Sequence, residues 1–362
     1  LRSEVEELRR QIRTRTVQST ELAPPPVDPA RFNSDSVVRA GDFRGAILLP
    51  GTDVSLRIDG YARLDSVYDT GFVGSGIRLF PATIALDGSP LAQRRGKTTL
   101  TGGQSRLSFD AQAKTELGLL RGYIELDFLK DDTDLRLRHI FGELRAGEFE
   151  VLGGQTWSTF MDPETLPQIV AMSAPVGAIF RRPPLLRLTR KFSEGLSGAI
   201  AIEDPATRDF TLPDPDNDQF LKRWPDFVAR MRLVNQDRCA FQVASLVRGI
   251  GFEEIAGRER LRTGWGLSAT GRINLNDGND IRMGVAGGRG IGSYLSGIAL
   301  DFSAAGPDVG GFRTLGAIGA FGALQHHWTE RWQSNLYYGY SNVESTPLMP
   351  SIAGDTTHNG GV

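Results

Sequence analysis

The sequence has little of several features that commonly stabilise or anchor a protein. Its 362 residues include one cysteine, Cys239, so an internal disulfide is excluded. No apolar run approaches the ~18 residues that a membrane-spanning helix needs. The chain starts at Leu1 and not at methionine, which predicts a processed or trimmed N-terminus. A targeting signal therefore cannot be identified from the sequence.

Lysine is also scarce: five of the 41 basic residues are lysines and the rest are arginines. A GC-rich genome could produce this bias without functional meaning. Alternatively, the bias reflects a need for guanidinium groups, which suit carboxylate and phosphate. The formal net charge of -2 excludes a general attraction to nucleic acid, which is therefore not an expected partner.

The first 50 residues differ from the rest of the chain. Residues 1–18 carry apolar side chains at 4-3-4 spacing, which predicts a coiled-coil helix that mediates oligomerisation. These side chains are Leu1, Val5, Leu8 and Ile12. A short amphipathic helix packed on its own domain is the alternative. Residues 19–50 contain Pro24, Pro25, Pro26 and Pro29 and predict a semi-rigid linker.

From residue 51 the apolar period is two, which is typical of β-strands with unlike faces. Leu56 and Ile58, for example, alternate with Arg57 and Asp59. Many such stretches have about ten residues, which matches the ~9–11 residues of a membrane-crossing strand. A soluble β-sandwich is the alternative. Because the apolar faces are rich in glycine and alanine, we favour an all-β, transmembrane antiparallel barrel over residues 51–362.

The pattern predicts fourteen strands, including one at 293–302, and predicts that residues 345–362 form a loop. Bacterial barrels usually contain an even number of strands and close completely. We therefore expect a barrel of about sixteen strands whose last hairpin is missing from this sequence.

The polar faces of these strands would line a water-filled lumen. Arginines outnumber acids on them, so the lumen should be net basic and should favour anions by its field. Cancellation by acidic loops is the alternative. The expected pore-lining residues are Arg57, Asp59, Arg63, Arg106, Lys114, Arg121, Arg136, Arg138, Arg187, Arg230, Arg232 and Arg272.

The segment 162–184 lies between two expected strands, has no strand periodicity and is unusually apolar for an exposed loop. Long irregular loops are uncommon unless they have a function. We expect a constriction loop inside the barrel, with Asp162, Glu164, Arg181 and Arg182 near the passage. Packing of this segment on a neighbouring subunit is equally compatible.

The four histidines offer little support for an enzyme. Strict alternation places His139, which follows Arg138, on the outward face. His326 and His327 lie near a strand end, and neither they nor His358 have a nucleophile motif or metal-ligand spacing around them. We expect no enzymatic activity, no metal and no cofactor.

Two neighbouring stretches, LRLRHIFGEL (135–144) and EVLGGQTWSTFMD (150–162), resemble the DcaP-like outer-membrane porins. The order of heptads, proline-rich spacer and barrel is also similar to that family. The resemblance implies a homotrimer of sixteen-stranded channels in outer-membrane lipid and lipopolysaccharide, with a periplasmic coiled coil. It also implies a preference for small anionic solutes such as dicarboxylates. This chain differs in lacking a complete end and most of the coiled coil.

We therefore expect a passive diffusion channel of the bacterial outer membrane for small, anionic solutes, with its N-terminal helix in the periplasm. The alternative is a non-conducting structural or adhesive barrel that links envelope layers through that helix.

Overall fold

The computed structural model describes residues 39–72, 84–85, 88–94, 96–130, 134–169, 174–205, 220–221, 223–235, 238–253, 259–276, 278–297, 301–303, 313–344 and 356–361. The predicted coiled coil and the prolines of the linker lie outside the described residues, and so does the boundary between them.

One antiparallel sheet of 17 strands dominates the structure. Three of its strands have two residues each: β1 (Arg39–Ala40), β2 (Ile47–Leu48) and β12 (Phe220–Leu221). The other fourteen are β3 (Val54–Tyr61), β6 (Arg106–Thr115), β7 (Gly118–Lys130), β8 (Asp134–Ala146), β9 (Phe149–Gln155), β10 (Pro184–Lys191), β11 (Leu196–Glu203), β13 (Asp226–Asn235), β14 (Cys239–Glu253), β15 (Glu259–Asn276), β16 (Asn279–Arg289), β19 (Gly316–His327), β20 (Gln333–Val343) and β21 (Thr356–Gly361). Each of these fourteen pairs antiparallel with the next along the chain.

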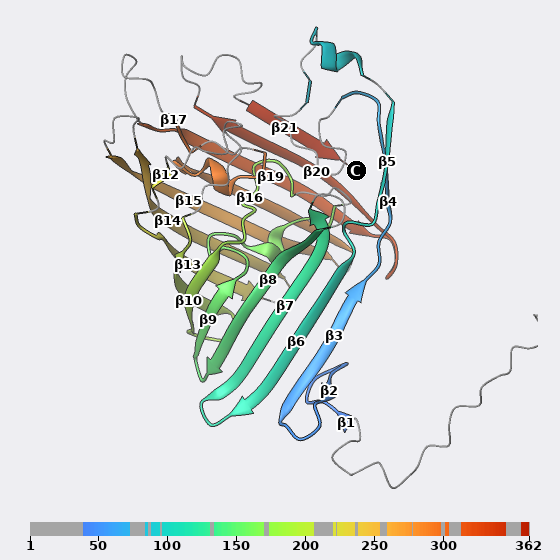
Figure 1. Cartoon of the computed structure of the whole chain (residues 1–362), viewed down its shortest axis with the longest axis vertical. Coiled ribbons are helices and arrows are strands. Elements are labelled where there is room, and N and C mark those ends of the chain that lie inside the picture. The colour runs from blue at the N-terminus through green and yellow to red at the C-terminus, as the bar shows by residue number, and fades with distance from the viewer. Residues whose placement is uncertain are drawn as a thin grey trace, which may run out of the picture.

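The remaining elements are short. Strands β4 (Asp65–Asp69) and β5 (Lys97–Thr101) pair with each other and continue the β3–β6 hairpin (Figure 1). Strands β17 (Phe302–Ser303) and β18 (Arg313–Thr314) form a separate pair. The described helices are 3₁₀ turns: η4 (Pro90–Gln93), η5 (Pro163–Thr165) and η6 (Gly292–Tyr294). None of them has the length and apolarity needed to cross a membrane.

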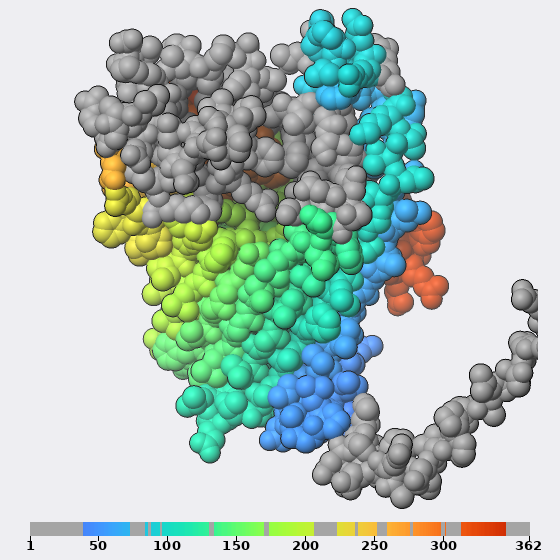
Figure 2. Space-filling view, viewed as in Figure 1, coloured from blue at the N-terminus to red at the C-terminus, as the bar shows by residue number. Residues whose placement is uncertain are grey.

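The sheet curves so that β6, β7 and β8 lie in front of β15, β16 and β19 (Figure 1). In Figure 2 the side chains of β6 to β9 form a continuous outer wall. At one end of the sheet β3 pairs with β2 and β2 with β1, and at the other end lies β21. In the described part of the chain, β21 pairs with none of β1, β2 and β3. The structure therefore shows a large curved sheet, while its closure into a complete barrel stays a prediction.

The alternation of the sequence separates two faces. Large apolar side chains point outward and remain exposed, for example Ile200 (61%), Leu267 (59%) and Val243 (58%). Their neighbours on the inner face are polar or small and buried, such as Gln242, Ser268 and Ala201. This arrangement is the reverse of a soluble protein and confirms the predicted partition: an apolar belt faces outward and the charged side chains face inward.

Two predictions near the C-terminus are wrong. Of the strand expected at 293–302, the described residues 293–297 do not join the sheet, because Tyr294 and Leu295 are buried inside the curve around η6. Residues 356–361, expected in a loop, form β21 and pair with β20 from Tyr337↔Gly361 to Asn342↔Thr356. The apolar run at 293–302 satisfied the strand pattern, but an inner packing site suits an apolar run equally well.

The two ends of the sheet have different connections. Tight turns such as Glu116–Leu117 join β6 to β7, and Gly147, with φ 59°, allows the turn between β8 and β9. At the other end, long segments connect β9 to β10 and β16 to β19. In outer-membrane barrels the short turns face the periplasm and the long loops face outside. The β1–β2 hairpin lies at the short-turn end (Figure 1).

Candidate functional site

The connection from β9 to β10 is described at residues 156–169 and 174–183, and both parts lie on the inside of the curved sheet. Phe160, Met161 and Ile179 are almost completely buried in a cluster with inward side chains of the wall. These wall residues are Val228, Ala244, Leu246, Ala286, Ala317 and Val343. The wall residues beside this inner segment have small side chains. A Cβ on Gly319, for example, would lie 2.3 Å from the carbonyl oxygen of Gly177. Small residues on β14, β16 and β19 thus make room for the inner segment.

Polar contacts fix the same segment to the wall. Arg232 of β13 donates to Asp162 Oδ2 at 3.3 Å and pairs with Glu164 Oε2 at 2.6 Å. Arg282 of β16 donates to the Leu166 carbonyl at 2.5 Å. Two acids expected near the passage, Asp162 and Glu164, are therefore both paired with one arginine of the wall, which offsets one of their two negative charges.

A second inner segment, residues 290–297 after β16, lies beside the first. Ile179 and Leu295 form an antiparallel bridge. Gly177 N donates to Ser296 O at 2.8 Å, and Phe180 N donates to Tyr294 O at 2.9 Å. An isolated β-bridge and its neighbouring hydrogen bonds therefore join the two segments inside the sheet.

The inward arginines of β3 to β8 are paired with carboxylates. Arg121 binds Asp110 through two hydrogen bonds of 2.8 and 3.0 Å, and Arg57 reaches the same carboxylate at 3.4 Å. Arg136 and Arg138 share Asp127 at 2.6 and 2.9 Å. Because two arginines share each of these carboxylates, the positive charge of this wall is only partly offset.

Three further predicted positions on this side also have acidic partners. Arg138 and Arg106 approach Glu125 Oε1 at 2.5 and 3.6 Å. Arg63 pairs with Asp65 at 2.7 Å. Lys114 pairs with Asp42 in an exposed position at the end of β6, and Asp59 is exposed and caps its neighbour Gly60 N.

The prediction that His139 faces outward is wrong. The register between β7 and β8 shifts between Glu125↔His139 and Leu126↔Leu137, so Arg138 is the extra residue of a β-bulge. Both Arg138 and His139 consequently point inward and are buried. The His139 ring contacts Thr156 Oγ1 at 3.0 Å through Nδ1 and packs edge-on against Trp157. Alternation alone cannot reveal a bulge.

The inward arginines of β10, β13 and β15 are different. Arg187, Arg230 and Arg272 have no hydrogen bond or ion pair with any described residue, and their Nε atoms are buried. Arg187 and Arg230 flank β11, where they lie opposite Ala201 and Ala199. Arg230 is within electrostatic range of Arg187 and Arg232, and also of the acids Asp162 and Glu150. Arg187 is within range of Glu143, Glu150 and Glu203. The arginines on this side therefore lack a direct ion pair, while nearby acids offset part of their charge.

The last two predicted constriction residues follow the inner segment back to the wall. Arg181 donates to the Asp204 carbonyl at 2.9 Å and lies over the Tyr294 ring at 4.5 Å. Arg182 lies over the Trp157 ring at 4.7 Å. Trp157 also contacts Phe180, with ring centroids 5.1 Å apart.

Several buried acids of the interior were missed by the sequence analysis. Glu143, Glu203, Asp226 and Asp280 are each at most 8% exposed. Glu203, Asp226 and Asp280 occupy inward positions of predicted strands, so their parity in the alternating pattern could have identified them. Glu143 has the parity of His139 and points inward only because of the bulge at Arg138. Within the described ranges, no group of three potential metal ligands lies together.

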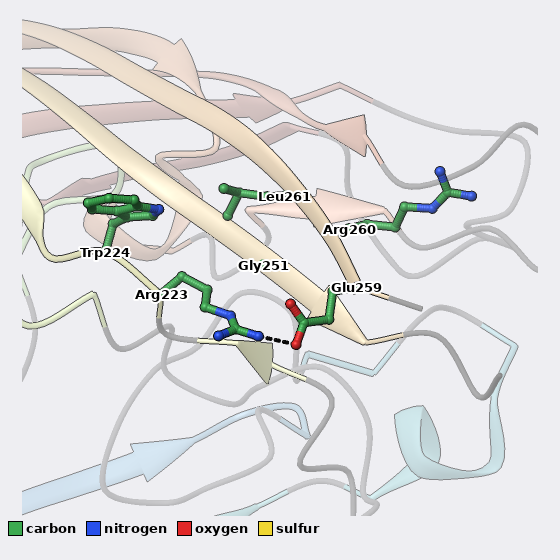
Figure 3. Close-up of a pocket in the computed structure, with 6 residues that line it drawn as sticks. All are labelled: Arg223, Trp224, Gly251, Glu259, Arg260 and Leu261. Atoms are coloured by element: carbon green, nitrogen blue, oxygen red, sulfur yellow. Dashed lines mark hydrogen bonds and ion pairs between the residues drawn. The ribbon is translucent and has the colours of Figure 1, made fainter. Parts of the chain in front are cut away.

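A surface pocket of about 430 Å³ lies near the long-loop end of β14 and β15 (Figure 3). Leu261 and Trp224, which are 47% and 57% exposed, line it beside the Arg223–Glu259 ion pair. Leu261 shares the outward parity of Trp265 on β15. The pocket therefore opens on the outer surface and does not belong to the lumen.

Comparison with solved structures identifies the same architecture elsewhere. The outer membrane channel DcaP of Acinetobacter baumannii superimposes with a TM-score of 0.71 at 19% identity, covering 89% of this chain and 87% of the other. An anion-selective porin from Comamonas acidovorans gives 0.52 at 9% identity, covering 80% of each chain. OmpT of Vibrio cholerae gives 0.51 at 10% identity, with 82% and 78% covered. At these identities the likeness concerns the fold, and it confirms the predicted DcaP-like architecture.

No curated protein sequence matches this chain. The family model described as the porin subfamily, however, matches residues 44–359, which include nearly the whole described sheet. An apolar outer belt, a polar interior and an inward-folded connection are what such a channel requires. The chain belongs to the porin subfamily and is an outer-membrane porin.

Proposed function

We propose that this porin is a passive diffusion channel that prefers small anionic solutes such as dicarboxylates. The observation that carries the proposal is the set of inward guanidiniums without an acidic partner among the described residues: Arg187, Arg230 and Arg272. Fixed positive charge on the wall of a narrow aqueous passage raises the local anion concentration and repels cations. Such selectivity needs no tight binding site.

The segment 156–183 is the proposed constriction. It is anchored inside the sheet by apolar burial and by Arg232 and Arg282, so it reduces the open cross-section. The positive side chains of β10 and β13 lie beside it, since Arg232 contacts Asp162 and Arg230 lies near Arg232. A solute that passes the constriction would therefore pass the unpaired arginines.

The other predicted pore-lining residues take a different role in this proposal. Arg57, Arg106, Arg121, Arg136 and Arg138 form a ladder of ion pairs with Asp110, Glu125 and Asp127 across β3 to β8. Five guanidiniums share three carboxylates, so the ladder supplies rigidity and also keeps part of its positive charge. Selectivity then depends on this ladder together with the arginines of β10, β13 and β15, which lie nearer the constriction.

We further propose that the barrel closes with about sixteen strands and assembles as a homotrimer surrounded by outer-membrane lipid and lipopolysaccharide. The heptad positions Leu1, Val5, Leu8 and Ile12 would form a periplasmic coiled coil. The β1–β2 hairpin lies at the short-turn end, which supports a periplasmic exit for the N-terminal residues. Native mass measurement in detergent tests the trimer, and a monomer would contradict it.

Reversal potentials in planar bilayers test the selectivity. With a potassium chloride gradient across the membrane, we expect chloride to be favoured over potassium, and we expect succinate to carry current. Preference for potassium would overturn the anionic proposal while leaving the porin fold in place. The absence of any current would instead favour a structural barrel.

A further inference from the structure

A cluster of buried charges joins both inner segments to the wall. Glu203 ends β11, Asp226 begins β13 and Arg248 belongs to β14, and these residues are 1%, 0% and 2% exposed. Arg181 comes from the first inner segment, Tyr294 from the second, and Asp301 from the connection that follows. Six side chains from separate parts of the chain thus meet in a site that is almost completely buried.

Glu203 fixes the start of the first segment. Its Oε1 accepts a 2.6 Å hydrogen bond from Thr159 N, and its Oε2 accepts one of 2.7 Å from Ser158 Oγ. The end of the same segment returns to this place, since Arg181 Nη1 lies 3.7 Å from Asp226 Oδ2. The cluster therefore holds the segment at both ends.

Arg248 fixes the second segment. It donates to Asp226 Oδ1 at 3.2 Å and to Asp301 Oδ2 at 3.2 Å, and also to the Gly290 carbonyl and Ser293 Oγ at 3.0 Å each. Asp301 in turn accepts a 2.8 Å hydrogen bond from Ser293 N. A buried guanidinium N–H without a hydrogen-bond partner destabilises the folded state, so these contacts of Arg248 hold the second segment in place.

Tyr294 lies at the centre of the cluster and has no exposed surface. Its hydroxyl donates to Asp226 Oδ2 at 2.7 Å, while the guanidiniums of Arg181 and Arg248 lie 4.5 and 5.4 Å from its ring centre. Phe160 of the first segment packs edge-on against the same ring. Burial raises the pKa of Tyr294 well above its usual value, so the phenol remains a donor.

We propose that Glu203, Asp226 and Tyr294 are positioning residues for the constriction: they fasten segments 158–181 and 290–297 together, so that the two hold one arrangement and move only as a unit. This rests on the proposed function in one respect, namely that segment 156–183 narrows the passage. The backbone pairing of Ile179 with Leu295 makes the two segments mechanically continuous. Loss of one buried hydrogen-bond partner leaves its counterpart unsatisfied and favours entry of water, which releases both segments.

Single-channel recording of Glu203→Gln and Tyr294→Phe tests the inference. The second variant removes one oxygen atom and is the milder one. We expect loss of the single steady conductance level, which should be replaced by fluctuation among several levels. Tyr338→Phe is the matched control, because Tyr338 points outward from β20 and is 54% exposed. A steady level in both cluster variants overturns the proposal.

A reversible tether separates positioning from general destabilisation. Ala178 and Ser296 face each other in the two segments, with Ser296 N donating to Ala178 O at 2.8 Å. We expect oxidised Ala178→Cys with Ser296→Cys, in a Cys239→Ala background, to restore the steady level in Glu203→Gln, and a reductant to remove it again. Failure of a formed disulfide to restore the level contradicts the positioning role.

Amide exchange provides a readout that does not depend on conduction. Phe180 N and Gly177 N are hydrogen-bonded between the segments, so both should exchange at least tenfold faster in Tyr294→Phe, while amides of β14 and β15 stay unchanged. Unaltered exchange at these amides contradicts the inference even if the channel passes no current. The wild type could prove cation-selective or pass no current while Tyr294→Phe still shows faster exchange at these amides. That result contradicts only the proposed function.

Discussion

Removing the two unpaired arginines that flank β11 should reduce anion selectivity by a calculable amount. Arg187 and Arg230 point inward without an ion pair to any described residue. At a distance of ~7 Å in water, one unit charge changes the energy of a passing monovalent ion by about 0.6 kcal/mol. Physiological salt has a Debye length of ~8 Å and reduces this to about 0.3 kcal/mol.

The effect has opposite signs for chloride and potassium, so their permeability ratio changes by twice that energy. Losing one guanidinium should lower the ratio about threefold, and losing both should lower it roughly eightfold. Arg187→Gln with Arg230→Gln should therefore shift the reversal potential in a potassium chloride gradient toward zero. The shift should shrink in molar salt, where the Debye length is about 3 Å.

The control replaces an ion pair on the other wall. Arg121→Gln with Asp110→Asn removes one charge of each sign, because these residues bind each other at 2.8 Å. The permeability ratio should change little in this variant. If it changes as much as in the Arg187 and Arg230 variant, or if the latter keeps the unmodified ratio, selectivity does not come from the unpaired arginines.

Three other perturbations have defined outcomes. In Gly177→Ala the new Cβ would lie 2.0 Å from Tyr340 O at a φ of +80°, so residues 174–182 should leave the wall and raise the single-channel conductance, with an unchanged urea midpoint of the barrel. Ile200→Lys places a charge on the outer belt and should cost about 2–4 kcal/mol in vesicle unfolding titrations, whereas the inward Thr270→Lys should cost far less. The backbone N–H of Gly316 holds the pKa of Glu344 below its usual value, and Arg289 adds to this. The carboxylate of Glu344 therefore stabilises the folded state fully above its unfolded pKa, and this stabilisation is lost as the pH falls through its folded pKa. The NMR chemical shift of the Gly316 amide should change over the same pH range. It should not change in Glu344→Gln.

Most of the fold could be predicted from the alternation of apolar and polar residues along the strands. Because successive side chains of a strand point to opposite faces, Leu56 and Ile58 could be separated from Arg57 and Asp59 without knowledge of any neighbour. The same parity assigns Arg187 and Arg230 to the inner face. It fails at residues 293–297, because this apolar segment is buried inside the curved sheet, although its composition resembles that of a strand.

Pairing of the inner charges could not be predicted in this way. Whether an inward arginine is neutralised depends on the residue that the register places across from it, as with Asp127 beside Arg136 and Ala201 beside Arg187. One bulge at Arg138 changes that register and turns His139 inward. Strand register is set by contacts between distant residues, which composition and period do not contain.

The sequence alone determined that long strands with one apolar and one charged face surround a polar interior, because the period of a strand is a local property of its backbone. Tertiary structure decided which arginines lack a direct ion pair, where the 156–183 segment is anchored, and that Glu203, Asp226 and Tyr294 meet. Each of those outcomes depends on side chains that are far apart along the chain and adjacent only after the sheet has curved around them.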